Sequence, residues 1–282
     1  MTTIEAKSDP QLSGASRWTC FFRRTRAVGA VVTQGTWLWL AAASLASSPA
    51  AAQLRTSQSP AADVRLAPLE AQALLASASK RARFQGAPAG NDVRQAADWI
   101  VDSGDNRGLP FVIVEKKDAE VFVFDPRGQI LGTAPALVGL APGDDSVPGI
   151  GDRPLAGIRP EERTTPAGRF TASLGHDLGK LDVLWVDYAD AISLHRVITT
   201  NPKERRLQRL ATPTPLDNRI SYGCINVPKN FFEHVVQSAF TGTNGIVYIL
   251  PEIKSMHDVF PTYYDVAEHS QLRSENLPAP PR

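Results

Sequence analysis

The chain has 282 residues, 43% of them hydrophobic and 21% charged, and its formal net charge is +1 at pH 7. This length suits one or two domains with a sizeable core. The ordinary composition excludes wholesale disorder and a polytopic membrane protein. Residues 1–63 and 266–282 differ from the middle of the chain because they are rich in Ala, Ser, Pro and Gln.

The N-terminal region has the three parts of a cleavable secretory signal. Three arginines between residues 23 and 26 precede an apolar core at residues 37–46, and small residues stand near Ala52. The apolar core is shorter than the ~20 residues that a membrane-spanning helix needs. We therefore expect a signal peptide over residues 1–52 and a location in the periplasm or cell envelope. An uncleaved membrane anchor is the alternative.

Removal of this signal changes the charge and the cysteine content. The net charge falls from +1 to −2, and nucleic-acid binding, which needs a positive surface, becomes a poor candidate function. Cys20 leaves with the signal, so that Cys224 is the one thiol of the mature chain. In an oxidising compartment such a cysteine pairs with another molecule, lies inert in the core, or is reactive.

Residues 53–108 are expected to form a helical N-terminal segment. PLEAQALLASASKRARF, residues 68–84, combines helix-forming residues with an apolar period. A second helix is predicted over residues 92–103, with Asn91 as its N-cap and Gly104 at its end. Nothing in this segment indicates chemistry, and we expect it to pack on the next domain or to act as a spacer.

The following part of the chain has the period of β-strands. PFVIVEK and EVFVFD, with QILGTAPALVG after the turn DPRG, predict a three-stranded meander. Four further segments have strand character: GRFTAS, LDVLWVDY, DAISLHRV and GIVYIL. The chain is therefore expected to be mainly β with one or two helices, an α+β protein.

One helix is predicted in this half, beginning at Pro228, a favourable first helical residue, with an apolar stripe from Phe231 onward. Two segments rich in proline and charge, residues 141–168 and 199–219, are expected to be long loops, which in a compact domain are often functional. Residues 255–282 are expected to be a Pro-rich tail.

Cys224 stands in the turn-like stretch ISYGCINVP. A nucleophilic cysteine needs an accessible sulfur, a lowered pKa and nearby backbone N–H groups for an oxyanion. Gly223 permits close approach of a substrate or a positive φ, and the helix from Pro228 would direct its positive end toward the sulfur. The alternative is a small buried hydrophobic residue, as most free cysteines are.

A base for this thiol has to come from the histidines, which are His176, His195, His234, His257 and His269. His195 ends the predicted strand DAISLHRV, on the opposite face from Leu194, where it can meet a cysteine distant in sequence. A satisfied, half-buried histidine is the alternative. Zinc binding by Cys224 with two histidines is a third interpretation, but no pair has metal-ligand spacing, and we expect no metal.

S-Y-G-C-I-N, residues 221–226, resembles the [S/T]-H-G-C-x-N signature of the L,D-transpeptidase (YkuD-like) catalytic domain. Other landmarks follow in the family's order: the opening meander, TTPAGRF as its T-P-x-G-x-F segment, an upstream histidine at His195, and GIVYIL as the closing strand. The resemblance covers about residues 109–252. It implies a β-sandwich catalytic domain, which we place at residues 109–254.

Two features depart from the family pattern. Tyr222 replaces the usual histidine before Gly-Cys, which leaves His195 as the sole candidate base. His195 and Cys224 are 29 positions apart, which is longer than is typical, because of the insertion at residues 199–219. The insertion suggests an altered lid over the site, and hence an altered substrate or acceptor.

Two groups of charged residues are ambiguous. The basic residues of the insertion could attract substrate carboxylates, or KERRLQR could be a solvated helical turn, which we favour. Asp144 and Asp145 are expected to be solvated loop carboxylates.

The resemblance implies roles for individual residues. Cys224 is the nucleophile and His195 the base that generates its thiolate, while the backbone N–H groups of Gly223 and Cys224 are the oxyanion donors. Four neighbours have supporting roles: Ser221 and Asn226 hold the turn, and Arg196 and Tyr222 line the pocket.

The resemblance also implies a substrate, the peptide stem of bacterial peptidoglycan. Family members cut the stem after its third residue, commonly meso-diaminopimelate, and release the terminal D-alanine. The thioester passes to an amine, which gives a crosslink, or to water. No metal or organic cofactor is implied. A hydrolase on the same scaffold and a non-catalytic wall-binding module are the alternatives, and the oligomeric state is open.

Overall fold

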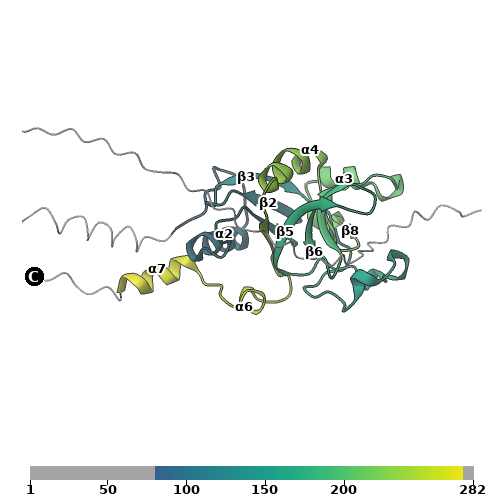
Figure 1. The fold of residues 1–282 in the computed structure, drawn as a ribbon. Coiled ribbons are helices and arrows are strands. Elements are labelled where there is room, and N and C mark those ends of the chain that lie inside the picture. The colour runs from purple at the N-terminus through teal and green to yellow at the C-terminus, as the bar shows by residue number, and fades with distance from the viewer. Residues whose placement is uncertain (1–79, 276–282) are drawn as a thin grey trace, which may run out of the picture. The chain divides into compact units, whose positions relative to one another are not determined.

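The computed structural model of the chain describes residues 80–275 (Figure 1). The predicted signal peptide and the part of the helix predicted over residues 68–84 that precedes residue 80 lie outside this range. None of the helices within it is both long enough and apolar enough to cross a membrane.

Most strands belong to one eight-stranded sheet with the order β3-β2-β1-β10-β5-β6-β7-β9. Neighbours are antiparallel except for the pairs β1–β10 and β7–β9. The strands of this sheet are β1 (Phe111–Glu115), β2 (Glu120–Phe124), β3 (Ile130–Pro135), β5 (Gly168–His176), β6 (Asp182–Asp187), β7 (Ile192–Arg196), β9 (Ile225–Val227) and β10 (Gly245–Ile249). The remaining two named strands, β4 (Val138–Gly139) and β8 (Arg219–Ser221), form a separate parallel pair.

The prediction of a mainly β fold is confirmed, as are the opening meander and the four later strands. Two strands were not predicted, β8 and β9, and β4 is the separate end of QILGTAPALVG, which was predicted as one strand. Each is only two or three residues long, too short for a period-2 pattern to be recognised. They are nevertheless the strands that surround the cysteine turn.

One face of the sheet encloses a core built around a single helix. Valines of β1 and β2, together with apolar residues of β5, β6, β7, β9 and β10, pack against Phe232, Val236 and Phe240. The helix consists of α4 (Lys229–Phe231), a π-helical turn (Phe232–Val236) and α5 (Gln237–Phe240). Pro228 precedes its first residue instead of being that residue, so the predicted start was one position early.

The other face of β1, β2 and β10 is covered by α2 (Asn91–Ser103). Gly104 ends this helix as expected, with φ 69° and its N–H donating to the Ile100 carbonyl. The N-cap is Gly90 and not Asn91. The helix predicted through residue 84 does not extend over residues 80–84, because Arg83 instead forms a β-bridge with Gln129.

The expected Pro-rich tail contains two helices within the described residues, α6 (Met256–Val259) and α7 (Val266–Glu275). The Trp99 indole donates to the Thr262 carbonyl at 2.9 Å, and the Tyr264 hydroxyl donates to Asp102 at 2.9 Å. The segment from residue 255 therefore lies against α2, as Figure 1 shows for α7. Its apolar residues recur at helical spacing, a pattern that the expectation of a Pro-rich tail overlooked: Met256, Val259, Phe260, Tyr263 and Tyr264.

Short helical turns interrupt both predicted long loops. The first loop contains 3-10 turns at Ile150–Asp152, Leu155–Gly157 and Pro160–Glu162. The second contains 3-10 turns at Pro202–Glu204 and Pro215–Asp217 on either side of α3 (Arg206–Ala211).

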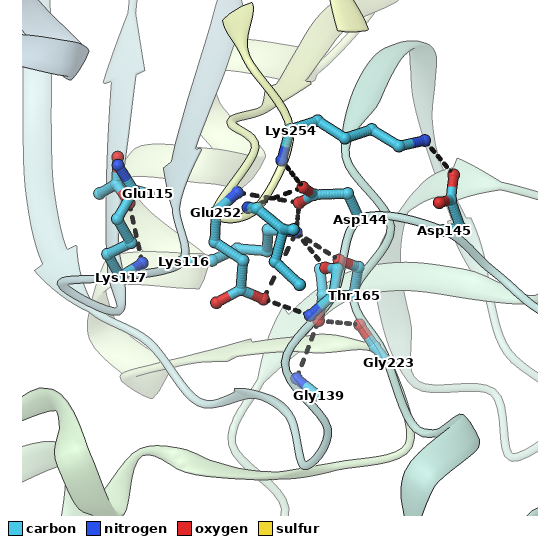
Figure 2. Close-up of polar contacts among 12 residues, drawn as sticks. Glu115, Lys116, Lys117, Gly139, Asp144, Asp145, Thr165, Gly223, Glu252 and Lys254 are labelled. Atoms are coloured by element: carbon cyan, nitrogen blue, oxygen red, sulfur yellow. Dashed lines mark hydrogen bonds and ion pairs between the residues drawn. The ribbon is translucent and has the colours of Figure 1, made fainter. Parts of the chain in front are cut away.

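A buried ion pair joins the first loop to the sheet (Figure 2). The side chains of Lys116 and Asp144 are 0% and 1% exposed, and Nζ lies 2.7 Å from Oδ1. Asp144 also accepts the backbone N–H groups of Glu252, Ile253 and Lys254 at 2.7–2.9 Å. The expectation that Asp144 is solvated was wrong, because it supplies the counter-charge that a buried lysine requires. Asp145 is exposed, as expected.

The stability of the protein should depend on pH through Asp144. Burial raises the pKa of its carboxyl, but Lys116 and three backbone N–H groups lower it more, from 3.8 to about 2. Because the folded pKa lies below the unfolded one, the stabilisation is complete above pH 5 and is lost as the pH falls toward 2. The full effect is about 2 kcal/mol.

Urea unfolding of the wild type and Asp144→Asn at pH 7, 5 and 2.5 measures this effect. At pH 7 the variant should be less stable by about 3–5 kcal/mol, since it removes the nearer carboxylate from the buried Lys116 ammonium and leaves only Glu252, 3.7 Å away. The difference should narrow by about 1–2 kcal/mol between pH 5 and pH 2.5. A difference that is constant across this range would show that Asp144 does not titrate as described.

Candidate active site

Cys224 lies in the tight turn between β8 and β9. Gly223, the residue before it, has φ 127°, and a Cβ at this position would lie 2.7 Å from the Ile192 side chain and 2.8 Å from the Thr164 carbonyl oxygen. The position therefore requires glycine on both conformational and steric grounds. The Gly223 N–H donates to Ser221 Oγ at 3.1 Å, inside the turn.

Strand pairing brings His195 to this turn from 29 positions away. β7 runs parallel to β9, with Leu194 opposite Ile225 and His195 opposite Asn226. Side chains alternate along β7, so Leu194 enters the core while Ser193 and His195 share the other face. His195 therefore lies opposite Leu194, as alternation predicted.

The environment of the thiol favours its ionisation. Burial raises the pKa of Cys224, but the hydrogen bond and charge of His195, followed by hydrogen bonds from Ser193, lower it more, and the net direction is down. Sγ lies 3.6 Å from Ser193 Oγ and 3.6 Å from the Ala191 carbonyl oxygen. Strand β9 separates Cys224 from the helix that follows, and this helix is not among the main causes of the lowered pKa.

The orientation of the His195 ring follows from its second contact. Nδ1 lies 2.8 Å from the Arg196 carbonyl oxygen. A carbonyl only accepts hydrogen bonds, so Nδ1 carries the proton and Nε2 has the free lone pair. Nε2 is thus the nitrogen available to take a proton from the thiol.

Ser193 is a site residue that the sequence analysis missed. It lies on the same face as His195 because the two are two positions apart on one strand. Alternation along DAISLHRV could have identified it, once His195 had been assigned to the site.

A cleft of about 470 Å³ opens beside Cys224. Both predicted long loops contribute to its walls, together with the turn between β6 and β7. All of the predicted site residues except Gly223 line the cleft. The charged side chains around it carry both signs: Arg153, Arg196, Arg206, Asp177, Asp182, Asp190 and Glu204.

The remaining predicted residues are all found around the turn. Ser221 is buried and accepts the Gly223 N–H. Tyr222 lines the cleft, with the Arg163 guanidinium 3.9 Å above its ring. Arg196 also lines the cleft, and its guanidinium lies 3.7 Å from Glu233.

Asn226 connects the turn to the insertion. Its Nδ2 donates to the Cys224 carbonyl at 3.2 Å, and its Oδ1 accepts a hydrogen bond from Arg206 at 2.7 Å. Arg206 also pairs with Glu204, and its side chain is only 13% exposed. KERRLQR does contain a helix, α3, but Arg206 is not the solvated residue that we favoured. It fixes the insertion to the cysteine turn.

The zinc interpretation finds no support in residues 80–275, where His, Cys, Asp and Glu form no group of three or more placed to hold a metal ion. His176 is exposed and pairs with Asp182 at 2.8 Å. His234 is exposed on the helix after β9.

No protein-family model and no curated protein matches the chain. Solved structures that match include the helical cell shape determining protein Pgp2 from Campylobacter jejuni, with 16% identity over 64% of this chain and 60% of that chain, and a TM-score of 0.35. An L,D-transpeptidase from Mycobacterium tuberculosis matches with 15% identity, over 50% and 57% of the two chains, and a TM-score of 0.32. The catalytic domain of the E. faecium L,D-transpeptidase matches with 14% identity, over 50% and 95%, and a TM-score of 0.29. This chain thus spans about 60% of the first two proteins.

Replacing His195 should reduce the reactivity of the thiol. In the wild type, the rate of alkylation of Cys224 by iodoacetamide should rise with a midpoint below pH 9, the ordinary pKa of the group. In His195→Ala the midpoint should move upward, and the rate at pH 7 should fall by about tenfold. Peptide mass spectrometry follows Cys224 separately from Cys20. His234→Ala is the matched control, and equal rates in all three proteins would exclude His195 as the activating group.

Proposed function

We propose that this protein is an exported cysteine L,D-transpeptidase that acts on peptidoglycan stem peptides. The observation that carries the proposal is the thiol of Cys224, whose pKa is lowered by His195 in a cleft large enough for a peptide. The S-Y-G-C-I-N motif supports the substrate class by its resemblance to the family signature. The proposal includes export by residues 1–52 and a catalytic domain over residues 109–254.

In the proposed reaction the Cys224 thiolate attacks the carbonyl carbon that precedes the terminal D-alanine of a tetrapeptide stem. A C–S bond forms, and the carbonyl electron pair moves onto oxygen, where backbone N–H groups stabilise the charge. When this intermediate collapses, the C–N bond breaks and the His195 imidazolium gives its proton to the departing amine. The acyl group remains on sulfur as a thioester. An acceptor amine then attacks the thioester carbonyl and forms a C–N bond, while His195 takes up the proton of the amine. The C–S bond breaks, and its electron pair returns to Cys224 as the thiolate.

The charges of the cleft are compatible with such a substrate. A stem peptide that contains diaminopimelate carries both carboxylates and an amine. Arginines such as Arg153 and Arg196 line the cleft together with carboxylates such as Asp190, so groups of both signs can find a partner there.

A muropeptide with a tetrapeptide stem tests the reaction. Incubated with the purified protein, it should give crosslinked dimer and free D-alanine, both measured by mass spectrometry. Cys224→Ala should give neither product. Tripeptide without dimer would show that water is the acceptor and that the protein is a hydrolase. If no product appears and Cys224→Ala binds wall fragments as well as the wild type, the protein is a non-catalytic wall-binding module.

A carbapenem should acylate Cys224, as the family resemblance implies. The thiolate opens the β-lactam ring, so the protein should gain the whole mass of the drug at the peptide that contains Cys224. The gain should be absent in Cys224→Ala and slower in His195→Ala. A wild type without a mass increase, or an equal increase in Cys224→Ala, would contradict the proposed nucleophile.

A further inference from the structure

Thr165 belongs to the T-T-P-A-G-R-F segment at the end of the first long loop, and its hydroxyl has two fixed partners. The residue is 1% exposed. The Gly139 N–H donates to Oγ1 at 2.8 Å, and Oγ1 lies 2.8 Å from the Gly223 carbonyl oxygen. Because an N–H only donates and a carbonyl only accepts, the Thr165 hydroxyl must donate its proton to Gly223.

This bond acts on the peptide group that joins Gly223 to Cys224. The group is planar and trans, so the Gly223 C=O and the Cys224 N–H point in opposite directions within one rigid unit. A hydrogen bond that holds the carbonyl toward Thr165 therefore holds the Cys224 N–H away from Thr165. Glycine adopts the φ of 127° and many other conformations without strain, so the direction of this peptide group has to be fixed by contacts from outside the residue.

The Gly223 N–H is less available as an oxyanion donor than expected, because it already donates to Ser221 Oγ. The Cys224 N–H is the remaining member of the pair of oxyanion donors that the sequence analysis named. The stabilisation of an oxyanion therefore depends more on the direction of the Cys224 N–H than on that of the Gly223 N–H.

Thr165 is itself rigidly held (Figure 2). Its carbonyl accepts a hydrogen bond from the buried Lys116 ammonium at 3.1 Å. Gly139 approaches the same segment so closely that a Cβ there would lie 2.6 Å from the Thr165 nitrogen. A hydroxyl on such a fixed support can impose its geometry on the cysteine turn.

We propose that Thr165 is a positioning residue that aims the Cys224 N–H at the oxyanion formed when the thiol is acylated. The inference rests on the proposed function only in taking acylation of Cys224 as the reaction. It assigns to the T-P-A-G segment a direct connection to the nucleophile.

The role can be separated from thiol activation by comparing two reactions of the same sulfur. Acylation by p-nitrophenyl acetate passes through a tetrahedral oxyanion: a C–S bond forms, and p-nitrophenolate leaves. Alkylation by iodoacetamide displaces iodide at a saturated carbon and forms no oxyanion. Loss of a correctly aimed donor should therefore slow the first reaction and not the second.

In Thr165→Val, acylation of Cys224 should be about 10- to 100-fold slower than in the wild type. The alkylation rate and its pH profile should remain within about twofold, because His195 and Ser193 still set the pKa of the thiol. Thr165→Ser keeps the hydroxyl and should acylate at nearly the wild-type rate. Thr171→Val, an exposed threonine on β5, controls for the loss of a hydroxyl elsewhere.

Two results would overturn the proposal. Equal slowing of acylation and alkylation in Thr165→Val would mean that Thr165 only maintains the structure. Acylation that is strongly reduced in Thr165→Ser, which retains the donor, would exclude the hydroxyl as the determinant even if the valine variant fails to fold. Because p-nitrophenyl acetate is not a stem peptide, these outcomes do not depend on the muropeptide experiment, whose failure would count against the proposed function and not against the role of Thr165.

Discussion

A buried ammonium group organises the region around the cysteine turn. A lysine removed from water is costly unless it is paired and hydrogen-bonded, and the Lys116 side chain is fully buried. Its partners come from two other segments: the first long loop, through the Asp144 carboxylate and the Thr165 carbonyl, and the segment after β10, through Glu252. The cysteine turn therefore depends on a tertiary contact among distant segments and not on local preference alone.

The turn is supported from two long loops. Thr165 holds the Gly223 carbonyl, and Arg206 holds the Asn226 side chain, whose NH2 group donates to the Cys224 carbonyl. Loops of this length usually vary and move more than the elements that they connect. In this protein they contribute fixed side chains to the turn. Such pre-organisation matters for acyl transfer, because the nucleophile and the oxyanion donor need their geometry before the substrate arrives.

With tyrosine at position 222, the proposed chemistry relies on a single imidazole. The Arg196 carbonyl fixes the protonated nitrogen of His195, and the other nitrogen has to accept and return every proton. The Arg163 guanidinium lies over the Tyr222 ring. A permanent positive charge thus stands next to position 222, where the signature that this motif resembles has a histidine.

The sequence by itself determined the mainly β fold, because the apolar period of the long strands does not depend on their surroundings. It also identified Cys224 and His195 as candidates, since the S-Y-G-C-I-N motif and a strand-end histidine are local patterns. Only the tertiary structure decided that Asp144 is buried, that Arg206 reaches the cysteine turn, and that the Thr165 hydroxyl binds the Gly223 carbonyl. Each of these side chains lies in a loop whose local sequence looks solvated, and its burial and partners are set by segments far away in the chain.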